Sequence, residues 1–223
     1  MPLISDYDDE TRRSVVQMVS PILERSAGAG FLWGMAIPEQ IDHALGFCWA
    51  AEDRLERSPS SALDLGTGGG IPGLVLAAAW PDLELILLDA NERRTHFLPE
   101  EIETWGISDR VKVVRGRAEE VGRLPELRGS LELVTARSFG SPAVTAECSA
   151  PFLARGGIVV VSEPPGPPES SRWPVEALGQ LGLAPGSTYR YGGRFGYQLL
   201  EKGAETPDRF PRRTGIPAKR PLF

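Results

Sequence analysis

The chain has 223 residues, of which 41% are hydrophobic and 24% are charged, and its net charge is −6. This composition predicts a folded core and excludes a disordered chain. No apolar run approaches the roughly 18 residues that a membrane span needs, and the first residues lack the basic-then-apolar layout of a secretory signal. Both absences predict a cytoplasmic protein that does not bind a membrane. We also expect a monomer.

The two cysteines, Cys48 and Cys148, are far apart in the sequence and show neither CxxC nor Cys/His spacing. This pattern predicts buried free thiols and gives no indication of a disulfide or a metal site.

Charge is distributed unevenly along the chain. Residues 209–223 hold five basic residues and no acid and therefore carry a charge of +5. Since the net charge of the whole chain is −6, the other 208 residues carry −11. A basic terminal segment on an acidic body is the asymmetry expected of a local phosphate contact, although a solvated tail has the same composition.

Two segments before residue 60 have helical spacing, at 10–25 and 38–57, and a Gly-rich break at 26–30 separates them. After residue 60, short apolar runs alternate with helical stretches. The expected strands are 62–65, 83–89, 111–115, 131–136, 158–162, 188–191 and 196–200, and the expected helices are 73–80, 92–105 and 142–153.

This alternation predicts an α/β fold with a mainly parallel sheet that is covered on both faces. Gly192-Gly193 joins the last two runs and indicates a hairpin, so the seven-stranded sheet ends in an antiparallel pair. The order is typical of the Rossmann-like class I methyltransferases. We expect an N-terminal helical extension at 1–60, a cofactor-binding domain at 61–205 and a basic tail at 206–223.

A glycine-rich loop follows the first expected strand, with the sequence Asp64-Leu65-Gly66-Thr67-Gly68-Gly69-Gly70-Ile71-Pro72-Gly73. Glycines allow a sharp turn and a close approach to a ligand, and the N-terminus of the following helix offers free N–H groups. The spacing satisfies the dinucleotide fingerprint GxGxxG, which alone is a weak signal. Asp64 favours S-adenosylmethionine (SAM), since an acid there can hold the amino group of methionine but repels a pyrophosphate.

Asp89 ends the second expected strand, about 20 residues after the loop. An acid at this position can accept hydrogen bonds from ribose hydroxyls. Because NAD and SAM sites share this feature, Asp89 indicates a nucleoside and leaves the choice between the two cofactors open.

The loop, together with Arg93-Arg94-Thr95-His96-Phe97-Leu98, resembles the small-subunit ribosomal RNA guanine-N7 methyltransferases, the glucose-inhibited division protein B family. Three further stretches carry the resemblance in the same order: Arg115-Gly116-Arg117-Ala118-Glu119-Glu120, Val134-Thr135-Ala136-Arg137-Ser138-Phe139 and residues 210–222. Five motifs in register are specific, whereas the glycine loop alone is generic.

The resemblance implies site residues. Gly66 and Ile71 would line the SAM pocket, Ala118 and Glu119 would border the adenine, and Arg137 would lie against SAM or the substrate. The loop residues Thr67, Gly68 and Gly70 complete the cofactor set. The implied partner is rRNA or the small ribosomal subunit, with phosphate contacts from the tail: Arg212, Arg213, Lys219 and Arg220.

The implied reaction is methylation of a guanine N7 in small-subunit (16S) rRNA. N7 has a free lone pair at neutral pH, so direct transfer needs no general base, and the protein's task is positioning and electrostatics. This agrees with a chain that has two histidines and no Ser/His/Asp or Cys/His arrangement. No catalytic residue is named.

The sequence departs from the family pattern in two places. The segment 41–47, with His43, has Gly46 where the family has an acid, and Ser162-Glu163 stands where the family tends to have Lys-Gly. Two alternatives therefore stay open: a divergent member that methylates another RNA or a small metabolite, and a non-catalytic module that binds SAM or RNA.

Overall fold

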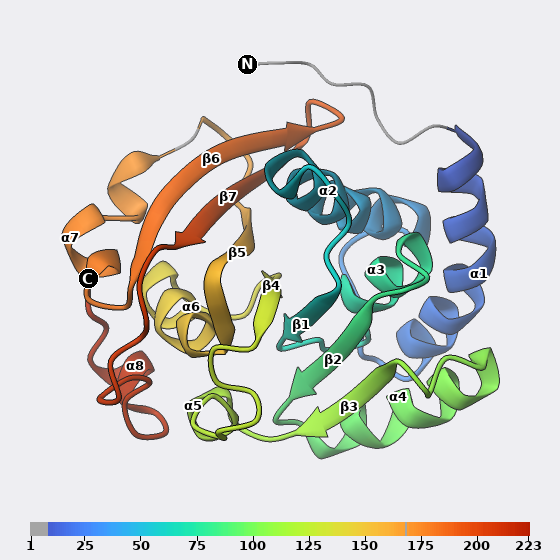
Figure 1. The fold of residues 1–223 in the computed structure, drawn as a ribbon. Helices are drawn as coiled ribbons and strands as arrows, with labels where there is room; N and C mark the ends of the chain where they lie inside the picture. The colour runs from blue at the N-terminus through green and yellow to red at the C-terminus, as the bar shows by residue number, and fades with distance from the viewer. Residues whose placement is uncertain (1–8, 168) are drawn as a thin grey trace.

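The computed structural model describes residues 9–167 and 169–223 and contains one seven-stranded sheet (Figure 1). The strand order is β3-β2-β1-β4-β5-β7-β6, and every pairing is parallel except those of β7 with its two neighbours. The strands are β1 (Ser61–Leu65), β2 (Glu84–Asp89), β3 (Val111–Arg115), β4 (Leu131–Ala136), β5 (Leu153–Glu163), β6 (Leu183–Tyr191) and β7 (Phe195–Lys202). The predicted fold class is confirmed, including the antiparallel pair at the end.

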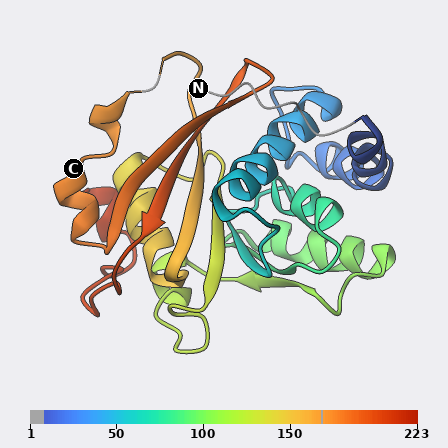
Figure 2. The same ribbon diagram turned by 45° about the horizontal axis from the view of Figure 1, so that its top comes forward.

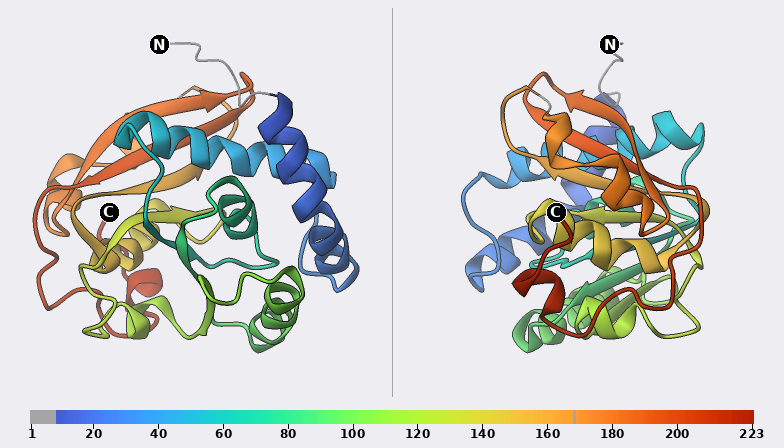
Figure 3. Two further views of the ribbon diagram at one scale, coloured as in Figure 1. Left: turned by 45° about the vertical axis from the view of Figure 1, so that its right-hand side comes forward. Right: turned by 90° about the vertical axis from the view of Figure 1, so that its left-hand side faces the viewer.

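Helices cover both faces of the sheet (Figures 1 and 3). The helices on one face are α1 (Asp9–Gly28), α2 (Ile37–Leu55), α3 (Gly73–Ala79) and α4 (Glu92–Trp105). Those on the other are α5 (Ala118–Val121), α6 (Pro142–Ser149), α7 (Val175–Gly179) and α8 (Ile216–Lys219), and two short 3₁₀ turns lie at Ala150–Phe152 and Ser170–Arg172. The chain between β3 and β4 and the chain after β7 thus cover the face opposite α1–α4.

Alternation along the strands explains why two separate cores form. Successive side chains of a strand point to opposite faces, so in β1 Ala62 joins the core beneath α1–α4, whereas Leu63 and Leu65 join the core beneath α5–α7. Both faces of the central strands are buried, which is why these strands read as continuous apolar runs.

The N-terminal helices belong to the first of these cores. Val15, Val19, Ile22 and Leu23 are buried on one face of α1 at helical spacing, and they share a cluster with residues of α2, α3 and the sheet. The first 60 residues therefore have no described core of their own, and α1 and α2 support the elements that carry the glycine loop.

Gly46 of α2 allows the close approach of β7. A Cβ atom at Gly46 would lie 2.1 Å from the Tyr197 hydroxyl oxygen, and that hydroxyl donates a 2.6 Å hydrogen bond to the His43 carbonyl oxygen. Tyr197 is only 1% exposed. Gly46 is thus matched to a buried tyrosine in this chain.

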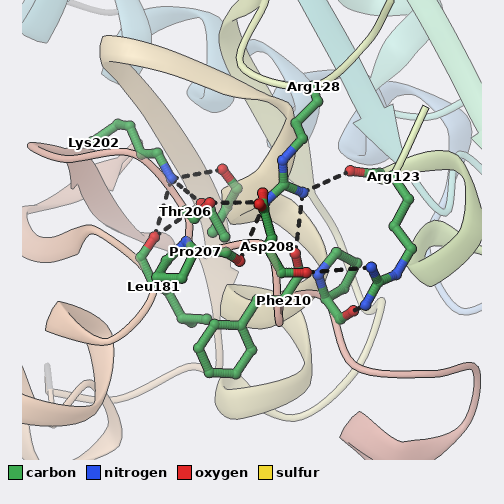
Figure 4. A network of polar contacts seen from close by, with 11 residues as sticks. Arg123, Arg128, Leu181, Lys202, Thr206, Pro207, Asp208 and Phe210 are labelled. Atoms are coloured by element: carbon green, nitrogen blue, oxygen red, sulfur yellow. Dashed lines mark hydrogen bonds and ion pairs between the residues drawn. The ribbon is translucent and has the colours of Figure 1, made fainter. Parts of the chain in front are cut away.

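The segment after β7 is held by a polar network (Figure 4). The Lys202 ammonium is buried and donates to the carbonyl oxygens of Ala150 and Leu181 and to the Thr206 hydroxyl. The Arg128 guanidinium donates to the carbonyl oxygens of Thr206 and Phe210, at 2.7 and 3.0 Å. The predicted tail therefore begins as a docked segment whose backbone acceptors are satisfied by side chains from distant elements.

The sequence prediction misplaced several boundaries. Strands β5 and β6 begin five residues earlier than predicted, and the short helices α5, α7 and α8 were not predicted, because four or five residues show no periodicity. Cys48 and Cys148 are buried and form no disulfide in the described part of the chain, as predicted. In the described part of the chain, no helix combines the length and the apolar character needed to cross a membrane.

Candidate cofactor and acceptor site

The glycine loop, residues 66–73, connects β1 to α3 through backbone that requires glycine. Gly66, Gly68 and Gly70 have φ values of +72°, +59° and +99°, in the region that side chains disfavour. A Cβ at Gly66 would also lie 2.7 Å from Cδ2 of Phe139. These positions explain the glycine spacing that the sequence displays.

Neighbouring elements fix the loop from both sides. The Ser26 hydroxyl, at the end of α1, is fully buried and donates a 2.9 Å hydrogen bond to the Gly69 carbonyl oxygen. The Gly68 N–H donates to Asp89 Oδ2 at 2.9 Å. Helix α1 thus holds the loop directly, a role that sequence analysis did not identify because nothing in the spacing links Ser26 to Gly69.

Asp64 lies behind the loop. It is 1% exposed, and its carboxylate accepts hydrogen bonds from the Gly73 N–H at 2.9 Å and from the Thr135 hydroxyl at 3.0 Å. It therefore ties the end of β1 to the N-terminus of α3 and to β4. The direct contact with the methionine amino group stays a prediction, since Asp64 is not among the residues that line the pocket described below.

Burial makes the stability of the protein depend on the Asp64 proton. Desolvation raises the pKa of Asp64 from 3.8 to about 6, against the opposing effect of its hydrogen bonds. Between these two values the folded protein keeps the proton and the unfolded chain has lost it. The stabilising contribution is therefore complete below about pH 4 and is lost as pH rises through about 6.

We expect the free energy of unfolding of the wild type, relative to Asp64→Asn, to fall by about 2–3 kcal/mol between about pH 4 and pH 7. Urea unfolding of both proteins across this range measures the difference. Asp82→Asn, at an exposed position, serves as the matched control. Its free energy of unfolding should differ from that of the wild type by the same amount at every pH. If the difference between the wild type and Asp64→Asn were also independent of pH, the raised pKa of Asp64 would be contradicted.

Asp89 ends β2 with a carboxylate that already has three protein donors. Oδ2 accepts from the Gly68 N–H and pairs with Arg94 at 3.2 Å, and Oδ1 accepts from the Asn91 N–H at 2.8 Å. A carboxylate has about four lone-pair positions, so room for a ribose hydroxyl remains chiefly on Oδ1. The ribose role stays a prediction, with Arg94 as the side-chain partner that a ligand would replace.

A pocket opens in front of the glycine loop, and we call it the cofactor pocket. Its lining consists of loop residues, the segment between α1 and α2, and side chains at the ends of α2, α4 and β4: Phe31, Leu32, Trp33, Gly34, Met35, Gln40, Gly66, Thr67, Gly68, Gly69, Ile71, Arg94, Arg137 and Ser138. The predicted Gly66, Thr67, Gly68, Ile71 and Arg137 are thus brought together. Residues 31–35 and Gln40 were missed, because they precede β1 and match no motif.

Two buried arginine nitrogens in this pocket, Arg137 Nη1 and Arg94 Nε, have no hydrogen-bond partner among the described residues. Arg137 Nη2 donates to Gln40 Oε1 at 2.9 Å, which leaves Nη1 buried and unpaired, whereas the buried Thr67 hydroxyl faces the Asp64 carboxylate and opposes the rise of its pKa. Buried donors without acceptors cost free energy, and a ligand with acceptor oxygens relieves that cost. The carboxylate and hydroxyls of SAM are such acceptors, so the residues present fit this cofactor.

A second hollow, the acceptor cleft, adjoins the cofactor pocket at Ser138. Its lining comes from the ends of β4 and β5 and from α2: His43, Ala136, Ser138, Phe139, Gly140, Pro142, Thr145, Val161, Ser162, Glu163, Pro164, Pro165, Arg172 and Trp173. Ser138 has a φ of +54°, which is rare for a residue with a side chain and is frequent at functional sites. Ser138 lies in the stretch 134–139 that carries the family resemblance, but it was not among the predicted site residues.

His43 lies in the acceptor cleft as a neutral side chain. Its ring stacks on Phe195 with centroids 4.6 Å apart, and its Nδ1 is buried without a partner among the described residues. Burial, with a smaller effect of Arg137, lowers the pKa of His43 to about 4. The imidazole therefore carries no charge at neutral pH.

Ala118 and Glu119 begin α5, which follows β3. Ala118 is buried, and Glu119 Oε1 accepts a 2.9 Å hydrogen bond from the Gly215 N–H of the tail. Neither residue lines the cofactor pocket as described above. Their place beside the adenine stays a prediction, and the structure adds that the tail is docked on Glu119.

The four predicted phosphate contacts of the tail differ in their surroundings. Arg212 pairs with the fully buried Glu147, with its Nη2 2.6 Å from Oε2 and its backbone N–H 2.7 Å from Oε1. Arg213, Lys219 and Arg220 are exposed and have no ion pair in the part of the chain that the structure describes. Arg212 is thus occupied within the protein, and the other three cations are free to meet a phosphate.

Comparison with known proteins agrees with this geometry. The sequence model of the GidB family, described as rRNA small subunit methyltransferase G, matches residues 37–163. The chain belongs to the GidB family. A ribosomal RNA small subunit methyltransferase G of Leuconostoc mesenteroides is 33% identical over 77% of this chain and 73% of its own. The ribosomal RNA small subunit methyltransferase G of Moorella thermoacetica is 36% identical over 75% of this chain and 72% of its own length.

The fold is also that of solved methyltransferases. An O-methyltransferase from Bacillus cereus in complex with SAH superposes with a TM-score of 0.58 over 82% of this chain and 89% of its own, at 14% identity. The GidB family consists of methyltransferases, and this member has the SAM-binding fold with a pocket that fits the cofactor. The chain is a SAM-dependent methyltransferase.

Proposed function

We propose that this GidB family member transfers a methyl group from SAM to N7 of a guanine in small-subunit (16S) rRNA. The observation that carries the proposal is the junction at Ser138, where the cofactor pocket and the acceptor cleft share one residue. Relatives at 33% and 36% identity are named as rRNA small subunit methyltransferases, which supports the substrate class.

SAM, when bound, supplies a methyl group that its sulfonium activates for direct transfer. The chain's residues have to hold donor and acceptor in line and keep water out. Arg137 and Arg94 would hold polar groups of the cofactor through their unpaired nitrogens, and the positive-φ glycines admit the cofactor close to the backbone. Guanine N7 has its own lone pair, so no residue needs to remove a proton first.

Neutral His43 suits a reaction whose product is a cation. Methylation at N7 leaves a positive charge on the guanine, and an imidazolium in the acceptor cleft would oppose it. The lowered pKa of His43 removes that charge at neutral pH. The cleft also presents Phe139 and Pro142, whose flat apolar faces suit an unpaired base.

The substrate is tested with tritiated SAM, purified small subunits and naked rRNA, followed by mapping of the labelled nucleoside. Label in 7-methylguanosine of small-subunit rRNA is the expected result. Label in another RNA or in a small-metabolite fraction would favour a divergent acceptor. SAM binding without any transfer would favour a non-catalytic module, and a lack of SAM binding would overturn the proposal.

The tail supplies phosphate contacts in this proposal, and their effect is expected in the salt dependence of binding. Replacing Arg213, Lys219 and Arg220 together with alanine should weaken rRNA binding and reduce the slope of log K against log salt by about 2, at roughly 0.7 per phosphate on single strands. Filter binding between about 50 and 200 mM salt measures this. An unchanged slope would show that the tail does not contact phosphates.

A further inference from the structure

A third hollow, which we call the flanking cavity, is lined by the segment after β5 and by residues of β6 and β7. Figure 2 shows the ribbon of strands β6 and β7 that carry part of this lining. The flanking cavity shares five residues with the acceptor cleft: Glu163, Pro164, Pro165, Arg172 and Trp173. One wall of side chains therefore separates the two hollows. A chain molecule with one unit in the acceptor cleft would reach this cavity with the next unit.

The floor of the flanking cavity is a row across three strands. Arg190 of β6 lies opposite Gly196 of β7, and Gly196 lies opposite Glu163 of β5. Residues directly opposite one another share a face of the sheet. Since Gly196 has no side chain, a gap remains between the side chains of Arg190 and Glu163. A Cβ there would meet Glu163 Cβ at 3.5 Å, an ordinary contact, so the gap has room for a side chain.

The acid in the wall is held in place. Glu163 Oε1 accepts a 2.9 Å hydrogen bond from the Trp173 indole N–H, and Oε2 pairs with Arg172 at 2.8 Å. Each oxygen keeps a further lone pair. Glu163 is therefore a fixed hydrogen-bond acceptor whose charge is compensated by Arg172, and it does not simply repel RNA.

Other polar groups in the lining are Glu169, Thr188, Tyr189, Arg190 and Gln198. The Gln198 side-chain N–H₂ donates to the carbonyl oxygens of Gly186 and Leu199, at 3.0 and 2.7 Å, which leaves its Oε1 as an acceptor. Arg190 has no ion pair in the described residues. The cavity thus combines acceptor oxygens on Glu163, Glu169 and Gln198, the unpaired cation of Arg190 and the apolar rings of prolines in the segment after β5.

We propose that the flanking cavity binds the nucleotide next to the methylated guanine in the RNA chain, and that it selects a base with an exocyclic amine. The amine of cytosine, adenine or guanine donates to Glu163 and Gln198, whereas uracil has no such group. Arg190 meets the phosphate of that nucleotide. The inference rests on the proposed function and gives Glu163, which departs from the family pattern, a role in sequence preference.

The test uses nucleoside 5′-monophosphates and the full chain saturated with S-adenosylhomocysteine, which keeps AMP out of the cofactor pocket. Calorimetry gives the affinities of CMP, AMP and UMP, and the indole N–H resonance of Trp173 reports the place of binding. CMP and AMP should bind about 10-fold more tightly than UMP and shift that resonance. Equal affinities for CMP and UMP, or an unmoved resonance, would overturn the proposal.

Two variants locate the contacts. Gly196→Val places a side chain in the gap between Arg190 and Glu163 and should abolish nucleotide binding. Arg190→Ala should lower the affinity for CMP by about 10-fold. Arg155→Ala removes the same charge from an exposed position in β5 that lines none of the three hollows, and should leave CMP affinity unchanged. Equal losses in Arg190→Ala and Arg155→Ala would mean that the cavity has no specific phosphate contact.

Methylation of small subunits by the wild type is measured in parallel. If wild type labels rRNA but fails to discriminate CMP from UMP, only the present inference is wrong. If nucleotides bind as expected but rRNA is never labelled, the proposed substrate fails and the cavity stands.

Discussion

Replacing Arg137 with alanine is expected to reduce methyl transfer to small-subunit rRNA on the order of 100-fold without unfolding the protein. Arg137 is held by Gln40 through Nη2 and directs an unpaired buried Nη1 toward the cofactor pocket. Removing the guanidinium removes a fixed donor at the junction with the acceptor cleft. Calorimetry measures the change in SAM affinity, and single-turnover label transfer measures the change in the rate of methyl transfer.

The control for this prediction is Arg155→Ala, which removes an arginine far from the pocket. Arg137→Lys is informative as well, because an ammonium keeps the charge but cannot reach Gln40 and the pocket with separate nitrogens. We expect it to recover only a small part of the activity. Wild-type transfer by Arg137→Ala would show that the arginine has no role in the reaction.

The largest effect on stability is expected from Arg212→Met, which should lower the free energy of unfolding by about 3–5 kcal/mol. Glu147 has no exposed side-chain surface, and both of its oxygens accept from Arg212. Without the guanidinium a buried carboxylate stays uncompensated. Urea unfolding at neutral pH measures the loss.

Two further variants separate this structural role from RNA binding. Glu147→Gln in the Arg212→Met background removes the stranded charge and should restore much of the stability. Arg213→Ala, next in the chain and exposed, should leave stability unchanged. A stable Arg212→Met protein with weakened RNA binding would instead support the phosphate contact that the sequence predicted for Arg212.

Truncation after Asp208 would therefore be a poor test of the tail's function. It would remove Arg212 together with the hydrogen bonds from Gly215 to Glu119 and from Thr214 to Glu120. A loss of RNA binding by such a protein would not separate missing phosphate contacts from partial unfolding. Substitution of Arg213, Lys219 and Arg220 avoids this difficulty.

The sequence by itself determined the fold class, the order of the strands along the chain and the glycine loop. Each depends on local chemistry: alternation of apolar runs with helical stretches, and positive-φ backbone that only glycine adopts easily at 66, 68 and 70. The ordered motifs also indicate the family to which the chain belongs.

Only the tertiary structure decided which side chains meet. Arg137 and Gln40 are 97 residues apart, and Arg212 and Glu147 are 65 apart. Asp64 lies behind the loop because β4 and α3 supply its hydrogen bonds. Such pairings depend on how strands and helices pack, and one sequence without its fold has no periodicity or spacing that encodes them.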